Sequence, residues 1–297
     1  MIQEQGYKSD TTLIHWRTHT IMLKTKCRDV PQFLDRIQEY YQNISYAPSK
    51  EIILFRGQCV DQPLLPKYAR TIKNMQSYEL DLIKNDEILP VEKNHLEEFK
   101  RQARWLTGKA PNNDWDWLAL AQHHGLETRL LDWTTNPLVA LYFAFEKCTF
   151  TQDCSPVVWL LKVSKNDVVT PTLKEHPLKV SHTKVFRPTI VSPRMIAQAG
   201  WFTVHKYLDE KQKFFSLDNN SLYRKSLGKL AFPNRAAHIL QYLDRIGINA
   251  FSLFPDLDGL CRQINHNPGF SMADSEFMQS PRRKGELPPP SAWTDCI

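Results

Sequence analysis

The sequence predicts an α+β fold, in which a mixed or antiparallel central sheet is flanked by helices. An almost uninterrupted apolar run at residues 157–163 is typical of a central strand. Helical periodicity is clear at residues 30–41 and 234–246, on either side of a middle region with shorter strand-like runs. The chain has 297 residues, of which 42% are hydrophobic, and this is enough to build one large core or two small ones.

Helices are expected where apolar residues recur at helical spacing behind a capping residue. Asp29 is a suitable N-cap for the helix at residues 30–41, and Asn136 is one for a helix that begins at Pro137. Asp114 or Asp116 is expected to cap a helix that stops at Gly125. The other helical segments are residues 77–106 with an interruption at Pro90, residues 234–246, and a short helix after Asp256 that reaches Ile264.

Strands are expected where short apolar runs are bounded by turn residues. These runs are residues 52–55, 130–131, 157–163, 185–186, 201–204 and 229–232. We interpret residues 1–28 as a polar leader and residues 29–265 as a single globular domain. Residues 266–297 lose periodicity, contain three consecutive prolines and a basic stretch, and are expected to be a disordered tail.

The composition is compatible with a cytoplasmic protein that has an anionic ligand, and also with one that has no special partner. A formal net charge of +6 suits an anionic ligand such as a nucleotide, although the Lys and Arg residues are too scattered for the basic stripe of a nucleic-acid binder. No apolar run approaches the ~18 residues of a membrane span, and no secretory signal is visible. The six cysteines form no CxxC pair, which predicts reduced thiols and a cytoplasmic location.

Arg56 is the first candidate for a functional residue. It follows the expected strand at residues 52–55 and precedes Gly57, which can adopt a positive φ or let the backbone approach a ligand closely. An arginine at a strand end suits bidentate binding of a phosphate or carboxylate, and Gln58 adds a polar side chain two residues later. The alternative is a structural arginine that is paired with a nearby aspartate.

The densest polar and aromatic cluster lies at residues 122–137, with the sequence QHHGLETRLLDWTTNP. A helix is expected to begin at its end, and a helix N-terminus is a natural site for an anion. The candidate site residues in this cluster are Arg129, Asp132, Thr134 and Thr135. The alternative interpretation pairs Asp132 with Arg129 and places Trp133 in the core.

His123 and His124 are candidates for donors that line the same site. The side chains of adjacent helical residues point ~100° apart, so the two histidines cannot chelate one metal ion together, and we expect no metal. A protonated histidine at a helix C-terminus would have a purely structural explanation.

Gln198 precedes the strand expected at residues 201–204, where its amide can face a ligand. Asp256 and Asp258 are explained better as helix-capping residues than as a Mg²⁺-binding pair. The sequence contains no GxSxG nucleophile motif and neither a GxGxxG nor a GxxxxGK[ST] phosphate loop.

Several ordered motifs resemble the FRG domain, a family named for its Phe-Arg-Gly motif. They are FRGQ at residues 55–58, QHHGL at 122–126, TRLLDWT at 128–134, NP at 136–137 and ALYFA at 140–144. Arg194 with Gln198, Gly200 and Phe202, and residues 247–248 with 254–260, are similar to the family too, so the resemblance covers about residues 30–265. It implies an FRG-domain protein of a largely bacterial family.

A weaker resemblance concerns ADP-ribosyltransferases of the Arg-Ser-Glu type. In those enzymes an aromatic-Arg-Gly strand end, a Ser/Thr-rich strand followed by an A-x-x-F-A helix, and a late Glu form the NAD site. The order of Phe55-Arg56-Gly57, residues 133–144 and Gln198 is similar here. The resemblance implies an ADP-ribosyltransferase-like fold.

The same resemblance implies roles for individual residues. Arg56 would bind the NAD diphosphate or ribose, Thr134 or Thr135 would orient the nicotinamide ribose, and Gln198 would contact the ribose 2′-hydroxyl. Because glutamine is neutral, it stabilises little positive charge, and Asp132 is the alternative acid. The other residues expected around the nucleotide are Gly57, Gln58, His123, His124 and Arg129.

Three hypotheses of function follow. The first is an ADP-ribosyltransferase-like or NAD-cleaving enzyme, a bacterial toxin or defence effector, with NAD as substrate and a protein or nucleic acid as its macromolecular target. The second is a non-catalytic module that binds a nucleotide or nucleic acid in the same cleft, where Trp133 stacks on a base. The third, a metal-dependent hydrolase that uses His123, His124 and Asp132, requires a bound metal ion.

Overall fold

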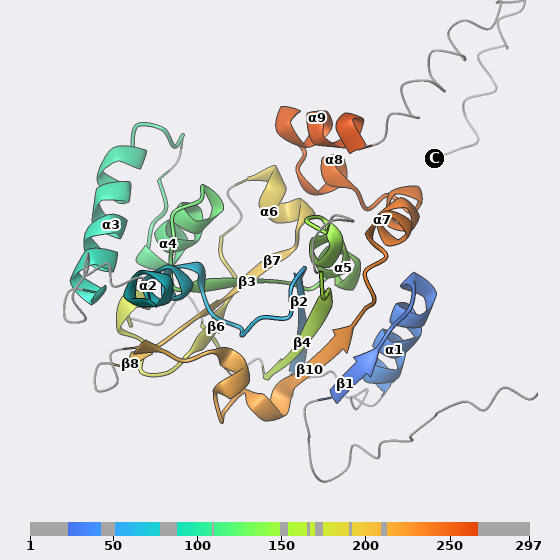
Figure 1. Cartoon of the computed structure of the whole chain (residues 1–297). Helices are drawn as coiled ribbons and strands as arrows, with labels where there is room; N and C mark the ends of the chain where they lie inside the picture. Colours follow the sequence, from blue (N-terminus) through green and yellow to red (C-terminus); the bar gives the residue numbers. More distant parts are fainter. Residues whose placement is uncertain are drawn as a thin grey trace, which may run out of the picture.

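The computed structural model describes residues 23–42, 51–77, 88–108, 110–148, 154–164, 167–169, 175–189, 192–208 and 213–266. They form an eight-stranded mixed sheet with helices around it, which confirms the predicted α+β class (Figure 1). Most of the expected leader, and the expected tail after residue 266, lie outside the described residues, so both stay predictions. Within the described part of the chain, no helix has both the length and the apolar character needed to cross a membrane.

The main sheet has the strand order β1-β10-β4-β2-β3-β7-β6-β5. Its strands are β1 (Leu23–Lys26), β2 (Glu51–Gln58), β3 (Leu130–Thr134), β4 (Val157–Ser164), β5 (Val168–Val169), β6 (Lys184–Phe186), β7 (Gly200–Val204) and β10 (Leu227–Ala231). The β1–β10 and β5–β6 pairs are parallel and the other neighbouring pairs are antiparallel. A separate two-stranded sheet joins β8 (Tyr207–Leu208) to β9 (Lys213–Phe214).

A single residue pair joins the two halves of the main sheet. β2 pairs with β4 and β3 pairs with β7 over their whole lengths, whereas β2 and β3 pair only between Phe55 and Thr134. Beyond that pair the strands diverge, and β3 runs across the direction of β2 in Figure 1. The residues just after Phe55 and just before Thr134 therefore face each other without ladder hydrogen bonds.

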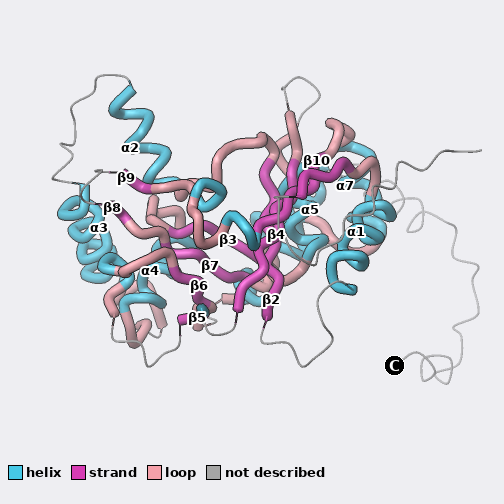
Figure 2. The backbone as a smooth tube through the Cα atoms, turned by 90° about the horizontal axis from the view of Figure 1, so that it is seen from below, coloured by secondary structure: helices cyan, strands magenta, loops and turns pink. Residues whose placement is uncertain are grey.

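Helices cover both halves of the sheet. They are α1 (Val30–Gln42), α2 (Lys67–Ser77), α3 (Ile88–Ala103), α4 (Asp114–His123), α5 (Pro137–Phe145), α6 (Pro193–Ala197), α7 (Ala236–Arg245), α8 (Ala250–Leu253) and α9 (Leu257–His266). Short 3-10 helices occur at Pro177–Lys179, Leu217–Asn219 and Arg224–Ser226. Figure 2 shows α5 and α7 near β4 and β10 and α4 near β6 and β7, with α1 and α3 farther out at the two ends of the molecule.

Two of the hydrophobic cores join helices to the sheet. Phe33 of α1, Phe55 of β2 and Phe145 of α5 are fully buried around Phe232, with the Phe33 and Phe145 rings 5.7 and 5.6 Å from the Phe232 ring. A second core joins α3 and α4 to β3 and β7.

A third core contains Leu54 of β2, Trp133 of β3 and Trp159 of β4 and therefore spans both halves of the sheet. Because burial of apolar side chains is the main stabilising contribution, this core holds the halves together where β2 and β3 share a single residue pair.

Local capping signals predicted the ends of several helices. The side-chain oxygens of Asp29 and Asn136 accept backbone N–H groups in the first turns of α1 and α5. Gly125 follows α4 with a φ of +95°, as expected for a helix stop at this residue. Asp256 Oδ1 accepts a backbone N–H in the first turn of α9 at 2.8 Å, in agreement with the capping interpretation.

The helices differ from the sequence predictions in three respects. Asn113, rather than Asp114 or Asp116, is the N-cap of α4, because its Oδ1 accepts the Asp116 N–H at 2.9 Å. Pro90 does not interrupt a helix, because it is the third residue of α3, where a backbone N–H has no intrahelical partner. The sequence did not predict α2, which is polar overall, or the short helices α6 and α8, which have five and four residues.

Candidate functional site

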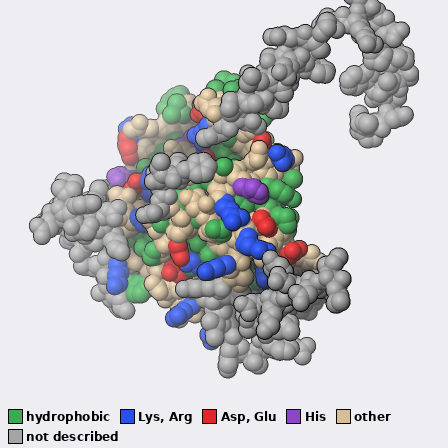
Figure 3. Space-filling model, turned by 45° about the vertical axis from the view of Figure 1, so that its right-hand side comes forward, with side chains coloured by type: hydrophobic (Ala, Val, Ile, Leu, Met, Phe, Trp, Pro, Cys, Tyr) green, Lys and Arg blue, Asp and Glu red, His purple; other side chains and the backbone are tan. Residues whose placement is uncertain are grey.

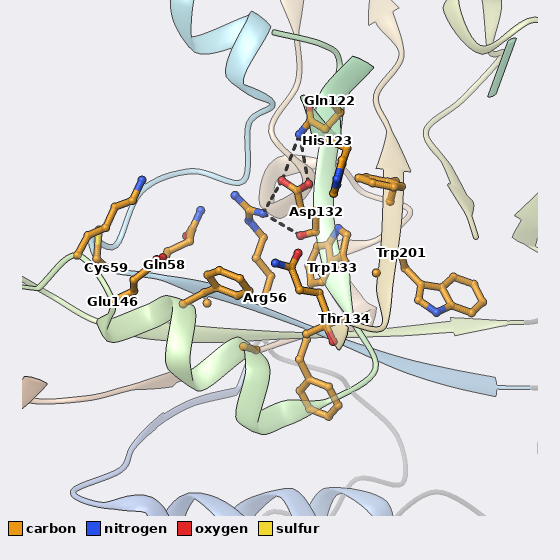
Figure 4. A pocket seen from close by; sticks show the side chains of 18 of the residues that line it. Arg56, Gln58, Cys59, Gln122, His123, Asp132, Trp133, Thr134, Glu146 and Trp201 are labelled. Atoms are coloured by element: carbon orange, nitrogen blue, oxygen red, sulfur yellow. Dashed lines mark hydrogen bonds and ion pairs between the residues drawn. The ribbon is translucent and has the colours of Figure 1, made fainter. Parts of the chain in front are cut away.

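A cleft of about 970 Å³ opens where β2 and β3 diverge (Figure 4). Its walls come from β2, β3 and the start of β7, with side chains of α2, α4, α5, α6 and the α8–α9 region. The sequence-predicted site residues that line it are Arg56, Gly57, Gln58, His123, Asp132, Thr134 and Gln198. Most of the residues selected from the sequence are therefore brought together in one cleft.

Gly57 lets α5 pack directly onto β2 beside this cleft. A Cβ atom at Gly57 would lie 1.9 Å from the Ala140 carbonyl oxygen and 2.5 Å from the Ala144 nitrogen. Both atoms belong to the backbone of α5, so no side-chain movement can make room. Gly57 does not have a positive φ, which makes that part of the expectation wrong. Its close neighbour is a helix, and this contact fixes the direction of the adjacent Arg56.

Arg56 projects from β2 toward Asp132 on β3 (Figure 4). Its Nη1 donates a hydrogen bond to the Asp132 carbonyl oxygen at 2.8 Å and lies 3.6 Å from the Asp132 carboxylate. The Arg56 Nε is buried and has no hydrogen-bond partner. Burial lowers the pKa of Arg56 and the charge of Asp132 opposes that change, so the guanidinium remains protonated at neutral pH. An enclosed cation with an unused donor is suited to an anionic ligand.

Asp132 offers an exposed carboxylate whose direction is fixed. Gln122 Nε2 donates to both carboxylate oxygens, at 3.2 and 3.3 Å. The Gln122 amide is itself oriented by Thr128, whose hydroxyl donates to Gln122 Oε1 at 2.7 Å. The Asp132 side chain is nevertheless 59% exposed. A negative charge held by Arg56 and Gln122 is thus presented to the cleft.

His123 lines the cleft, whereas His124 does not. Burial lowers the pKa of His123 to about 4, and the charge of Arg194 acts in the same direction. His123 is therefore neutral at pH 7, and the explanation by a protonated histidine at a helix end does not apply to it. Its Nε2 lies 3.3 Å from the Ser192 hydroxyl. His124 is exposed, with its ring edge-on to the His123 ring at 5.0 Å.

Thr134 and Gln198 line the cleft with their polar groups partly engaged. The Thr134 hydroxyl oxygen accepts the Asn136 N–H at 3.0 Å, which leaves its O–H as a donor. Gln198 Nε2 donates to the Leu253 carbonyl at 3.1 Å, which leaves its Oε1 as an acceptor. Thr135 is exposed and lies outside the lining, so of the two threonines Thr134 is placed to meet a ligand.

Arg129 lies in the core, contrary to its expected place around the nucleotide. Its Nε and Nη2 donate to the Glu92 carboxylate, and its Nη1 donates to the Leu178 carbonyl at 3.0 Å. The Arg129 and Glu92 side chains are only 1% and 3% exposed. The suggested pairing of Arg129 with Asp132 is wrong as well, because Asp132 pairs with Arg56.

Trp133 is buried, as the alternative interpretation of its segment held. Its Nε1–H donates to the Thr203 hydroxyl oxygen at 3.1 Å, on the neighbouring strand β7. The indole is 3% exposed and thus contributes to the cleft floor without a free face on which a base could stack.

The structure adds cleft residues to which the sequence analysis assigned no role. Among them are Arg70, Phe143, Glu146, Lys147, Arg194, Phe254 and Arg262. Phe143, Arg194 and Phe254 stand in segments that resemble the FRG domain, and this was the one signal that could have selected them. The other residues lie in helices and turns without a recognisable motif, and only the fold brings them to the site.

Comparison with known protein families gives one match, and it begins at the first residue of β2. The family model of the FRG domain matches residues 51–152. The chain carries an FRG domain. The match confirms the resemblance for this segment, which contributes Arg56, His123, Asp132 and Thr134 to the cleft. The cleft residues from Arg194 onward lie beyond the matched FRG segment, although the sequence resemblance extended to them.

No curated protein and no solved structure matches the chain. Among the residues that the structure describes, no group of three or more His, Cys, Asp or Glu side chains is arranged to hold a metal ion. The metal-dependent hydrolase hypothesis required one metal ion to be bound by His123, His124 and Asp132. These three residues do not form such a group of ligands.

Proposed function

We propose that the cleft binds a phosphorylated, nucleotide-like ligand, with Arg56 as its main anion contact. The observation that carries this proposal is the state of Arg56. Its side chain is only 15% exposed, its Nε has no partner, and it lines a cleft large enough for a ligand. Leaving a buried donor unsatisfied is unfavourable by about 1–3 kcal/mol, so such a group is expected to have a partner in the functional state.

The charge and size of the cleft support the same ligand class. Its positively charged lining residues are Arg56, Arg70, Lys147, Arg194 and Arg262, and its negatively charged ones are Asp132 and Glu146. Phe143 and Phe254 add apolar surface for a ring. A volume of about 970 Å³ falls within the range of small-molecule and cofactor sites, roughly 300–1,000 Å³.

A small ligand is favoured over a nucleic acid. On the face of the molecule shown in Figure 3, Lys and Arg side chains are scattered among Asp and Glu. A nucleic-acid binder typically presents its basic residues as a continuous patch or stripe. The concentrated positive charge in the cleft therefore points to a ligand that enters it, and Trp133 is too enclosed to stack on a base.

Replacing Arg56 with glutamine is the direct test of this site. We expect Arg56→Gln to weaken the binding of ADP or NAD about 10-fold or more, because a charge-assisted hydrogen bond contributes roughly 1.5–3 kcal/mol. Isothermal titration calorimetry measures the affinity, and thermal unfolding shows that the variant is folded.

Arg101→Gln is the matched control, since Arg101 is an exposed arginine of α3 that pairs with Glu98 and does not line the cleft. Its affinity for nucleotides should equal that of the wild type. If Arg56→Gln and Arg101→Gln bind ADP and NAD equally well, Arg56 is not the anion contact and the proposal is wrong.

A second candidate function is cleavage of NAD, favoured by the exposed and oriented carboxylate of Asp132. In this reaction the bond between the ribose C1′ and the nicotinamide nitrogen breaks, and its electron pair stays with nicotinamide. Water, or a nucleophile on a target, then bonds to C1′ and releases a proton to solvent. A nearby carboxylate stabilises the positive charge that develops on the ribose. Such an activity would suit a toxin or defence effector that depletes NAD.

Within this second candidate, Asp132 takes the role that a neutral Gln198 cannot fill. Thr134, with its free O–H donor, and Gln198, with its free Oε1, are suited to hold ribose hydroxyl groups at the other side of the cleft. Arg56 would neutralise the diphosphate. Gln122 keeps the Asp132 carboxylate in place.

Nicotinamide release from NAD measures this activity. We expect Asp132→Asn to reduce the rate about 100-fold or more, because the lost charge interaction is worth a few kcal/mol in the transition state. The isosteric amide keeps the shape of the site, so NAD binding should persist. If wild-type protein binds NAD without releasing nicotinamide, the cleft is a binding site only.

A further inference from the structure

We propose that Arg194, Arg262 and Phe254 form a second anion subsite in the cleft, so that its ligand carries two separate anionic groups. The inference rests on the proposed function of the cleft as a nucleotide site. It extends that function by naming the ligand class as a nucleotide with more than one phosphate group.

The centre of this subsite is the Phe254 ring, which holds two guanidinium groups. The Arg194 Cζ lies 4.4 Å from the ring centroid and the Arg262 Cζ lies 4.9 Å from it. The Phe143 ring contacts Phe254 edge-on at 6.1 Å. Cation–π contacts hold each arginine in place at the cleft wall without using its hydrogen-bond donors.

The positive charge at this wall is only partly balanced. Arg262 Nη1 lies 3.8 Å from the Glu146 carboxylate, a long contact that Glu146 does not share with Arg194. Arg194 has no ion pair among the described residues, and its buried Nε has no hydrogen-bond partner. Two neighbouring cations whose one ion-pair contact is 3.8 Å long would be stabilised by a further anion between them.

The electrostatic environment of Arg194 agrees with this arrangement. Burial lowers the pKa of Arg194, and the next largest cause is the charge of Arg262, which acts in the same direction. Asp256, Asp132 and Glu146 act against it. An anionic ligand group would offset the repulsion between the two arginines, and this makes the free energy of binding more favourable.

The wall is built rigidly around Phe254. A Cβ atom at Gly259 would lie 1.7 Å from the Phe254 carbonyl oxygen, so only glycine lets α9 sit against this residue. Asn249 and Ser252 form a reciprocal capping box at the start of α8, one turn before Phe254. The ring that supports both arginines is thus held by backbone contacts, and the subsite exists before a ligand enters.

This subsite is separate from the one at Arg56. Arg56 projects from β2 and contacts Asp132 of β3. Arg194 of α6 and Arg262 of α9 instead stack on the Phe254 ring at another wall of the same cleft. A ligand with one phosphate can therefore bind to one of the two arginine subsites, whereas a ligand with two phosphates can bind to both.

The affinities of AMP, ADP and adenosine 3′,5′-bisphosphate test this inference. For the wild-type protein we expect ADP or the bisphosphate to bind at least about 10-fold more tightly than AMP. Arg194→Gln should lower the affinity for the more tightly bound of these two ligands by a factor at least 10 times larger than the factor for AMP. Arg262→Gln should act in the same direction. Arg194→Lys keeps the charge and should retain part of the difference.

Arg101→Gln again serves as the matched control, and thermal unfolding shows whether each variant is folded. If the three nucleotides bind equally well, or if Arg194→Gln weakens all of them by the same factor, the second subsite is wrong. The proposed function still stands in that case, provided that Arg56→Gln weakens every nucleotide. Absence of any nucleotide binding by the wild type would contradict both.

Discussion

The Gly57→Ala variant is expected to lose about 3 kcal/mol of stability or more and to be prone to unfolding and aggregation. The added methyl group would lie 1.9 Å from the Ala140 carbonyl oxygen and 2.5 Å from the Ala144 nitrogen. Inserting a methyl group into a packed core typically costs about 1–3 kcal/mol when side chains can shift. Here the obstructing atoms are backbone atoms of α5, so we expect a loss at the upper end of this range or above.

Such a loss is large because the whole protein is stable by only about 5–15 kcal/mol. The same substitution would displace β2 from α5 and move Arg56 away from Asp132. Urea unfolding followed by circular dichroism measures the change in the free energy of unfolding. A soluble Gly57→Ala variant could additionally be tested for the loss of nucleotide binding.

Gly228→Ala is the matched control in the same sheet. A Cβ atom at Gly228 of β10 would lie 3.6 Å from its nearest neighbour, the Leu160 Cβ, which is an ordinary van der Waals distance. We therefore expect this variant to unfold at nearly the wild-type urea concentration. Equal stability of Gly57→Ala and Gly228→Ala would contradict the tight packing of α5 on β2.

The sequence predicted those features that depend on neighbouring residues. Asn136 and Pro137 mark the start of α5 because capping acts within one turn. The apolar run of β4 shows that this strand is buried on both faces, and it lies between β10 and β2 in the sheet. Arg56 and Asp132 were selected because they stand in dense motifs at strand ends, and the fold places these motifs opposite each other.

Features that depend on distant residues could not be predicted in this way. Arg129 stands in the same motif as Asp132, and no local signal shows that its partner is Glu92, a residue on α3. Arg194 and Arg262 reach the cleft only because α6 packs against α8, which in turn packs against α9. The divergence of β2 from β3 after their single residue pair opens the cleft and leaves no periodic pattern in the sequence.

The Glu92→Gln variant is expected to be destabilised by about 3–5 kcal/mol, the second large effect. The substitution leaves the Arg129 guanidinium buried at 1% exposure without its carboxylate partner. Breaking a buried ion pair by removing one partner is strongly unfavourable, because the remaining charge is neither hydrated nor compensated. Glu98→Gln is a control from the same helix, since the Glu98–Arg101 pair is exposed, and we expect no measurable change for it.

Replacing both members of the buried pair distinguishes an uncompensated charge from a loss of packing. In the double variant Glu92→Met with Arg129→Met no buried charge remains, and apolar side chains of similar length fill the space. Such replacements are often neutral, so the double variant should be more stable than Glu92→Gln despite carrying one more substitution. The Leu178 carbonyl loses a donor and limits the recovery. If the double variant retains nucleotide binding, Arg129 acts on the fold alone. Loss of nucleotide binding in a folded double variant would show that Arg129 contributes to binding, contrary to its position in the core.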